Sequence, residues 1–494
     1  MGQRADEAGT EGMPGIGRRT LLKGAGVAAG LALSGGLAGL LRLGSRPPSG
    51  EGFRAQLGIL FDSLSPLQRE AVVRPWDHPS RQMVGHVACL GSGRVSNVLS
   101  AAQQAHVHRL YEAMTSEDSR SRFGRLVGLE GGGLDPCEIV IYGDPHSERH
   151  QVALSGGHLL IRGGGITPEG SAFGGPLGYG HQLGNGVPRL PGNAFAYHGD
   201  AANALLANLD PHTRRRARVP DPPPFETAVQ LQGPGGEFAG LPVRSLDEGQ
   251  RGTLQGLIDV VLSCYDESDR SDALGCLRGN GGIDSLWLAV YEHGGIYDDG
   301  AVFSDLAPEE RMRRGEPYWH VWRIEGPGTA LHFRGWPHVH ASIHVASDGG
   351  AGQYVGEVLA ESDRLLQGEA LRRLLLAALR GESGAAVAFF PGEPHARFPA
   401  GPVTTGLVWS LDPYADEMAI ATIQGRDAAG PLREQAALQG VTLEPDQSYR
   451  VATSGYASGQ EELIGPVQDV ERSGRGLRYV YEAHLRSHSL RSTA

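Results

Sequence analysis

The stretch that decides the fold is EIVIYGDPHSERHQVALSGGHLLIR, residues 138–162. Its apolar residues fall into three short runs, at 139–142, 152–154 and 159–161, and Gly, Asp and Pro separate the runs. Short runs rich in Val, Ile and Tyr between turn residues are typical of β-strands. The sequence therefore predicts that a sheet forms here.

Helical signals lie on both sides of this stretch. Residues 65–68 (SPLQ) place Ser at an N-cap, Pro at the first helical position and Gln at the third. Residues 93–114 carry apolar side chains at helical spacing. Residues 245–248 (SLDE) match a capping box, and we expect it to open a helix that runs to about Tyr265.

Further strands are expected at 287–291 and within 319–345, and the Pro- and Arg-rich residues 214–225 are expected to be a loop. Helices and strands are mixed but do not alternate as in repeated β-α-β units, so the expected fold class is α+β. The Gly-rich passage at 346–352 (ASDGGAG) predicts a domain boundary.

A second α/β or α+β unit is expected beyond the boundary, beginning with a long helix on one face of which lie Leu365, Leu371, Leu374, Leu375 and Leu379. Its other expected elements are strands at 385–390, near Val408, at 419–423 and at 449–453, and helices at 432–439 and 476–485. We therefore divide the chain into a signal segment at 1–43, a linker at 44–53, an α+β domain at 54–346, a linker at 347–354 and a second domain at 355–488.

The first residues resemble an export signal of the twin-arginine type. Arg18 and Arg19 precede a weakly apolar segment, residues 24–41, which is diluted by Gly and Ala. Export to the periplasm, cell envelope or exterior is therefore expected. The alternative reading is that the segment stays in place as a membrane anchor, the only membrane contact we expect.

Composition limits the function classes. The 494 residues carry a net charge of −12, whereas a nucleic-acid-binding protein normally carries a basic surface, so no nucleic-acid partner is expected. The 74 glycines show no collagen-like period and indicate many turns. A small molecule is the partner that the sequence favours.

The first candidate for chemistry is PHVHASIH, residues 337–344. On a strand, His338, His340, Ser342 and His344 would share one face. Two imidazoles at i and i+2 can converge on one metal ion, with a third ligand supplied by a neighbouring element; the candidates are His332 and His158. The cofactor expected is one divalent transition metal ion of unspecified identity. The alternative is a solvent-facing polar strand or a set of hydrogen-bonded core imidazoles.

Residues 57–348 resemble the bacterial family catalogued as domain of unknown function 3500. The segments that carry the resemblance are LSPLQR at 64–69, IYGDP at 141–145, Gly157-His158, YWHVWRIEGP at 318–327 and HVH at 338–340. The resemblance implies a domain and names no reaction.

Residues 355–485 resemble the C-terminal, substrate-specificity domain of 5'-nucleotidases. The matching segments are AAVAFF at 385–390, PAGPVT at 399–404, VWSLDPY at 408–414 and YRVAT at 449–453. In that family two aromatic side chains enclose a nucleobase. The resemblance places Tyr414 at one of these positions and Tyr456 at the other, and both would otherwise be half-buried core tyrosines.

The partner metallophosphoesterase domain of that family is not evident. The sequence has no Asp-x-His near its start and no Gly-Asn-His-Glu, the elements that hold two metals in such enzymes. Two hypotheses follow. The chain is an exported metal-dependent hydrolase acting on a nucleotide-like or phosphorylated ligand, or it is a non-catalytic envelope protein that binds such a ligand.

Overall fold

The structure is a computed structural model, and it describes residues 49–83, 89–117, 120, 133–164, 170–181, 195–223, 229–291, 321–335, 339–350, 356–394, 396–488 and 490. The expected signal segment at 1–43 lies outside the described residues, as does His338. Within the described part, no helix combines the length and the apolar character needed to span a bilayer.

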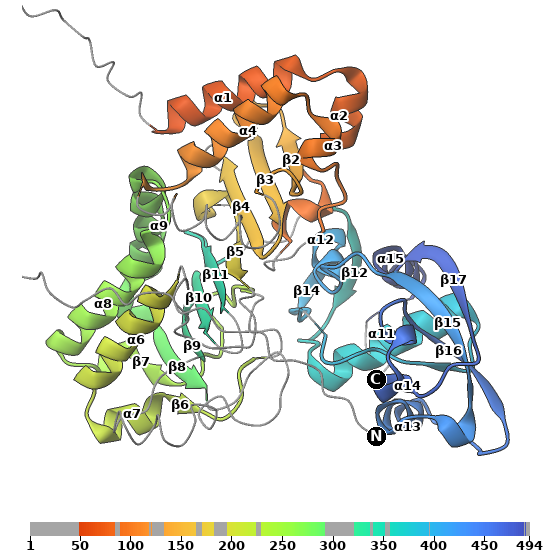
Figure 1. Cartoon of the computed structure of the whole chain (residues 1–494). Coiled ribbons are helices and arrows are strands. Elements are labelled where there is room, and N and C mark those ends of the chain that lie inside the picture. The colour runs from red at the N-terminus through yellow and green to blue at the C-terminus, as the bar shows by residue number, and fades with distance from the viewer. Residues whose placement is uncertain are drawn as a thin grey trace, which may run out of the picture. The chain divides into compact units, whose positions relative to one another are not determined.

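Eleven strands of the described chain form one mixed sheet (Figure 1). Their order is β1-β2-β3-β4-β5-β11-β10-β9-β8-β6, with β7 beside β8, and most neighbours run antiparallel. The bounds are β1 (Val73–Arg74), β2 (Glu138–Gly143), β3 (His150–Gly156), β4 (Leu159–Gly164), β5 (Leu177–His181), β6 (Arg218–Val219), β7 (Leu241–Pro242), β8 (Trp287–Tyr291), β9 (Val321–Gly326), β10 (Thr329–Arg334) and β11 (Val339–Val345).

Two smaller sheets follow in the C-terminal part of the chain. One has the order β13-β16-β15-β17 and the other pairs β12 with β14. The bounds are β12 (Val358–Ser362), β13 (Val387–Ala388), β14 (Gly401–Thr404), β15 (Glu417–Gln424), β16 (Ser448–Ser454) and β17 (Asp469–Gly476). The structure is thus a mixed α/β fold whose large sheet lies in the first three quarters of the chain.

The α-helices begin and end mainly where capping residues and turns allow. Their bounds are α1 (Ser49–Ser63), α2 (Pro66–Val72), α3 (Val95–Val98), α4 (Ala101–Met114), α6 (Ala196–Asn208), α7 (Pro211–Ala217), α8 (Glu248–Leu262), α9 (Glu267–Gly279), α11 (Gly368–Ser383), α12 (Thr405–Trp409), α13 (Gly430–Leu438), α14 (Glu461–Ile464) and α15 (Leu477–Ser487).

One face of the large sheet packs on helices. Side chains alternate between the two faces of a strand, and the apolar positions of β2–β5 and β8–β11 join α1, α4, α6 and α8 in one buried core. In β11, Val339, Ala341, Ile343 and Val345 belong to this core. The intervening positions of the same strands therefore face the other side of the sheet.

The second face of the sheet is covered by other segments. Over β2–β4 it packs against Trp409 of α12, with Met83 and Leu90. Beside β10, residues 229–231 pack on Ala330. The side chains between these two patches are largely polar, and they form the first candidate site.

The predicted elements are confirmed in most places and corrected in four. Residues 93–114 form two helices, α3 and α4, because Ser100 caps a new helix together with Gln103. The expected loop at 214–225 begins with α7, which Asp210 caps and Pro211 starts. The helix after residue 245 is capped by Asp247. The expected strand near Val408 is helix α12.

Candidate functional site

The second face of the large sheet carries the predicted histidines. In the register, His340 lies opposite Arg334, Ser342 opposite His332, and His344 opposite Ala330. The three side chains of β11 therefore share one face, as the alternation predicts. All three are buried, with at most 2% of each residue exposed.

His158 and His340 are brought together. His158 occupies the two-residue turn between β3 and β4, where it holds a φ of 59°, and its ring lies 5.2 Å from that of His340 between centroids. A left-handed φ is uncommon for a residue with a Cβ, and such strain is often found at functional positions. The turn thus places the side chain of His158 against that of His340, and both are residues of the predicted metal site.

The neighbours of these histidines are guanidinium groups. The guanidinium of Arg334 contacts the ring of His340, and Nε of Arg323 donates to Nδ1 of His332 at 3.3 Å. Arg323 also lies 3.8 Å from Glu325 in an ion pair that is almost fully buried. A positive charge beside an imidazole repels a metal ion and favours an anion.

His344 is held as a neutral imidazole. Its Nδ1–H donates to the carbonyl oxygen of Val229 at 2.8 Å. Burial lowers the pKa of His344 to about 4, and the positive charge of Arg162 acts in the same direction. The side chain is therefore a hydrogen-bonded core imidazole, as the alternative reading of this strand expects.

These residues do not fit a mononuclear metal site. No group of three His, Cys, Asp or Glu side chains that could hold a metal ion occurs among the described residues. His340 and His332 each lie against an arginine, and His344 lies four residues along the strand from His340. His338, the remaining candidate ligand, lies outside the described residues.

Sequence reasoning missed the buried arginines of this face. Arg162 on β4 is 1% exposed and donates to three backbone oxygens, those of Pro176, Met83 and Arg81. No carboxylate takes part in these three bonds, so the guanidinium brings a buried positive charge to the face. The available signal was an arginine directly after the apolar run 159–161, where a solvent-facing side chain is the usual interpretation.

The two predicted tyrosines lie on neighbouring loops of the C-terminal part. Tyr414 and Tyr456 are 53% and 62% exposed. The carboxylate of Asp416 accepts a hydrogen bond from the backbone amide of Tyr456 at 2.9 Å, and it joins the loop after α12 to the turn after β16. Neither tyrosine is a core residue, so the alternative reading is wrong for both.

The loop that carries Tyr414 is strained and anchored. Ala415 holds a φ of 56°, a conformation that costs a residue with a Cβ about 1–2 kcal/mol. The carboxylate of Asp412 accepts hydrogen bonds from the backbone amides of Asp416 and Tyr414, and burial raises its pKa to about 6. A strained turn held by a buried carboxyl group fixes the position of the tyrosine.

Helix α15 contacts the loop that carries Tyr414 through Arg478. Arg478 is 4% exposed, donates from Nε to the carbonyl oxygen of Asp412 at 2.8 Å, and lies 4.8 Å from the ring centroid of Trp409. Oδ2 of Asp412 and the hydroxyl of Tyr481 are buried without a hydrogen-bond partner among the described residues. Arg478 and Asp412 thus anchor the loop that carries Tyr414.

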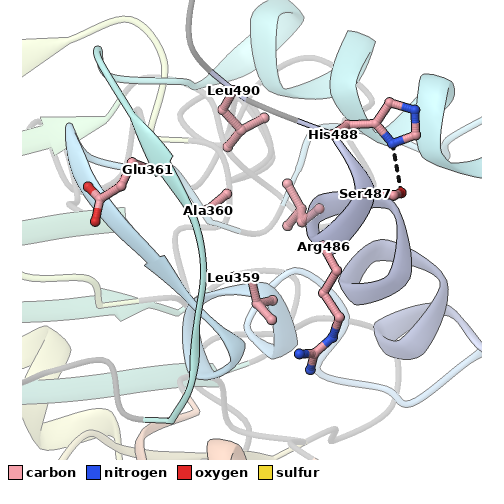
Figure 2. A pocket seen from close by; sticks show the side chains of 8 residues that line it. Leu359, Ala360, Glu361, Arg486, Ser487, His488 and Leu490 are labelled. Atoms are coloured by element: carbon pink, nitrogen blue, oxygen red, sulfur yellow. Dashed lines mark hydrogen bonds between the residues drawn. The ribbon is translucent and has the colours of Figure 1, made fainter.

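A separate cavity of about 310 Å³ lies between β12 and the end of α15 (Figure 2). Its lining is mixed: the apolar residues are Leu359, Ala360, Leu485 and Leu490, and the polar residues are Glu361, Arg486, Ser487 and His488. Neither predicted tyrosine lines this cavity, and neither do the sheet histidines that the structure describes.

Solved structures are similar to part of the chain, whereas no family model and no curated protein matches it. The 5'-nucleotidase precursor from Thermus thermophilus is 13% identical with a TM-score of 0.24, and the match covers 34% of this chain and 47% of that one.

Two further solved structures show a likeness of the same kind. A Staphylococcus aureus protein assigned as a 5'-nucleotidase, in complex with alpha-ketoglutarate, is 12% identical with a TM-score of 0.20, covering 35% of this chain and 48% of that one. The sulfate thiohydrolase SoxB from Thermus thermophilus, in complex with glycerol, is 13% identical with a TM-score of 0.23, covering 33% and 42%. The chain spans less than half the length of these solved structures, and its function is inferred from its own residues.

Proposed function

We propose that this protein binds a planar, nucleotide-like small molecule between Tyr414 and Tyr456. The observation that carries the proposal is the hydrogen bond from the backbone amide of Tyr456 to the carboxylate of Asp416, a residue of the loop that also carries Tyr414; it holds together two loops that each bear an exposed tyrosine. Exposed aromatic rings offer a stacking surface, and stacking of a base on an aromatic side chain contributes about 1–3 kcal/mol. The resemblance of residues 355–485 to a nucleotide-specificity domain supports the same ligand class.

One guanidinium, that of Arg472, lies near Tyr456, together with the carboxylates of Asp416 and Glu417. The guanidinium of Arg472 is 58% exposed and pairs with Glu417 at 2.9 Å. It lies so close to Gly455, the residue before Tyr456, that a side chain there would meet both Arg472 and Asp416. An anionic group of a bound ligand would therefore find a guanidinium beside one of the two rings.

Hydrolysis is the second candidate function, and the adjacent rings of His158 and His340 favour it. The chemistry would need a divalent ion, and Arg334 against His340 disfavours one. Metal analysis of the purified protein and a panel of phosphate esters test this candidate. Turnover by the wild type and not by His340→Ala would support a hydrolase.

The binding test uses adenosine 5'-monophosphate as the probe in isothermal titration calorimetry. We expect Tyr414→Ala and Tyr456→Ala each to weaken binding by about 1–3 kcal/mol, roughly 5- to 150-fold. Tyr414→Phe, which keeps the ring, should bind like the wild type. Tyr479→Ala is the control, because Tyr479 is 55% exposed but lies on α15.

Equal affinity of the wild type and both alanine variants would refute the tyrosine site. A loss in Tyr414→Phe as large as in Tyr414→Ala would show that the hydroxyl group, and not the stacking surface, binds the ligand. Absence of binding by the wild type would contradict the choice of ligand class.

The setting proposed for this activity is outside the cytoplasm, because residues 18–41 carry the twin-arginine export pattern. We also propose that residues 54–346 and 355–488 are the two domains of the mature chain. In this arrangement the second domain supplies the ligand site.

A further inference from the structure

Asp412 is a buried carboxyl group at the start of the loop that carries Tyr414. Only 6% of the residue is exposed. Its carboxylate accepts hydrogen bonds from the backbone amides of Tyr414 and Asp416, so the loop 412–416 folds back on this one side chain. The Oδ2 atom of the same carboxylate is buried and has no hydrogen-bond partner among the described residues. In its ionised form this oxygen lacks the donors that water would supply, which disfavours the charge.

The charged and titratable groups that face Asp412 come from three segments. From α15, the guanidinium of Arg478 favours the ionised carboxylate, and Tyr481 brings a buried hydroxyl group. From the same loop, the carboxylate of Asp416 repels the charge, and from a third segment the thiol of Cys89 interacts with it. Burial outweighs the attraction of Arg478 and raises the pKa of Asp412 to about 6.

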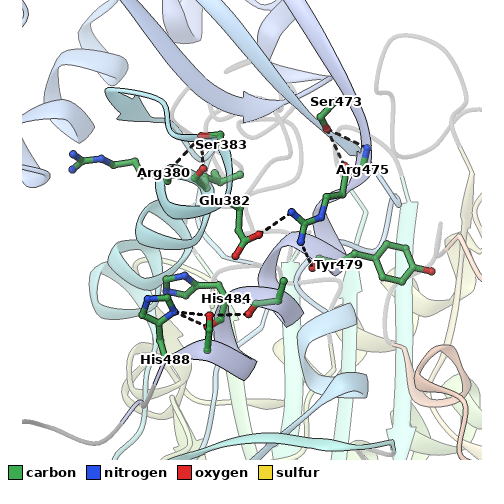
Figure 3. Close-up of polar contacts among 11 residues, drawn as sticks. Arg380, Glu382, Ser383, Ser473, Arg475, Tyr479, His484 and His488 are labelled. Atoms are coloured by element: carbon green, nitrogen blue, oxygen red, sulfur yellow. Dashed lines mark hydrogen bonds and ion pairs between the residues drawn. The ribbon is translucent and has the colours of Figure 1, made fainter.

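The helix beside the loop is held in place independently of Asp412. Arg475, at the end of β17, pairs with Glu382 of α11 at 2.8 Å and also donates to the carbonyl oxygen of Tyr479 in α15 at 3.5 Å (Figure 3). In the loop itself, Ala415 holds a φ of 56°, which strains a residue with a Cβ. A weaker hold on the loop would therefore move the loop and leave the helix in place.

Movement of the loop changes the protonation of Asp412. An open loop would expose the carboxyl group to water, where the ordinary pKa of an aspartate is 3.8. The closed loop binds a proton at this residue below about pH 6, whereas the open loop does so only in stronger acid. The state that binds protons more tightly is favoured by acid. The closed loop is thus stabilised as the pH falls through 6, and it loses this stability as the pH rises above 6.

We propose that Asp412 makes ligand binding at the tyrosine site dependent on pH. The protonated residue holds the loop closed with Tyr414 in position, and ionisation of the residue lets the loop open. The inference rests on the proposed ligand site between Tyr414 and Tyr456, since it states how that site is controlled. A ligand that needs the closed loop shifts the loop toward this state, so its binding is accompanied by the uptake of a proton.

The test is a calorimetric titration with adenosine at pH 5 and pH 7.5. Adenosine is the probe because it has no phosphate group, which would itself change charge at about pH 6. We expect the wild type to bind adenosine about 3- to 10-fold more tightly at pH 5, since the difference in pKa between the closed and the open loop allows at most about tenfold over this range.

Asp412→Asn keeps a carbonyl oxygen for the two backbone amides and never ionises. This variant should bind adenosine equally at the two pH values and, at pH 7.5, more tightly than the wild type. The matched control is Asp446→Asn, which removes an exposed carboxylate paired with Arg426 and should keep the wild-type dependence on pH. Equal affinity of the wild type at both pH values, or the same dependence on pH in Asp412→Asn, would overturn the proposal.

A second readout needs no ligand. In amide hydrogen exchange, corrected for intrinsic rates, residues 414–416 of the free wild type should be more protected at pH 5 than at pH 7.5, and those of Asp412→Asn equally protected at both. Equal protection in the wild type would contradict the pH-dependent loop. Protection that changes with pH, without adenosine binding at either pH, would support the pH-dependent loop and refute the proposed ligand site.

Discussion

His344 is an imidazole that the fold keeps uncharged. Its Nδ1–H is satisfied by Val229, and burial, aided by the charge of Arg162, lowers its pKa to about 4 against the opposing effects of the Val229 hydrogen bond and of Asp348. The unfolded chain binds a proton at this residue below pH 6.5, whereas the folded chain does so only near pH 4. The folded state is therefore stabilised with increasing pH between these values and loses that stability on acidification.

We predict that His344→Gln reduces the acid sensitivity of the protein. When the pH falls from 7 to 5, protonation of His344 in the unfolded wild-type chain should lower the free energy of unfolding by about 2 kcal/mol. Urea unfolding at the two pH values measures the difference. His344→Gln should show a smaller loss on acidification, and an unchanged loss would contradict the assignment of a neutral buried imidazole.

At the scale of residues, the sequence predicted which face of a strand a side chain lies on better than it predicted which residues that side chain contacts. The alternation at 338–344 correctly placed His340, Ser342 and His344 on one side of the strand. It could not show that Arg334 would lie beside His340 or Arg323 beside His332, because these contacts depend on the register of β10 with β11 and β9. A side chain's partner across a sheet is fixed by long-range pairing, which local spacing does not contain.

Strand β5 joins the two halves of the large sheet, and two of its glycines face the polar side. Gly178 lies opposite Ser342 and Gly180 opposite His340. A Cβ at Gly180 would collide with the carbonyl oxygen of Val339 and touch the ring of His340. The absence of a side chain here allows β5 and β11 to pair closely.

We predict that Gly180→Ala lowers the free energy of unfolding by about 3 kcal/mol, since the new methyl group meets backbone that cannot move without breaking the β5–β11 pairing. Chemical denaturation measures the loss. Gly235→Ala is the control, because nothing lies within 4 Å of a Cβ at that position. Equal stability of the two variants would contradict the pairing of β5 with β11.

At the scale of elements, long periodic segments were predictable and short ones were not. The helices α11 and α15 and the strands β15 and β16 lie within a few residues of their expected positions. Residues 405–409 form a helix although Val408 and Trp409 indicate a strand, because Thr404 caps a five-residue turn. The pattern of so few residues does not distinguish a helix from a strand. The packing of Trp409 on the large sheet determines which of them forms.

Contacts link the large sheet to the C-terminal part of the chain within residues 46–494, which form one compact unit. The backbone amide of Cys89 donates to the carbonyl oxygen of Pro413 at 2.7 Å, and Arg478 donates to the carbonyl oxygen of Cys89 at 3.0 Å. The amide side chain of Gln230 forms two hydrogen bonds with the backbone of Arg397. These bonds connect residues that lie far apart in sequence.

We predict that this unit unfolds in a single cooperative transition and that Arg478→Met destabilises it by about 2–4 kcal/mol, because two buried carbonyl oxygens lose a charged donor. Differential scanning calorimetry measures both. Arg486→Met is the control, since Arg486 lies on the same helix and its side chain is 44% exposed. Two separate transitions in the wild type would show that the predicted domains at 54–346 and 355–488 unfold independently.

The most direct measurement is a crystal structure of the protein grown with adenosine 5'-monophosphate. We predict density for the base stacked between the rings of Tyr414 and Tyr456, with the anionic end of the molecule on the side of Arg472. Density for the nucleotide elsewhere on the chain, with both tyrosine rings open to solvent, would contradict the proposed site.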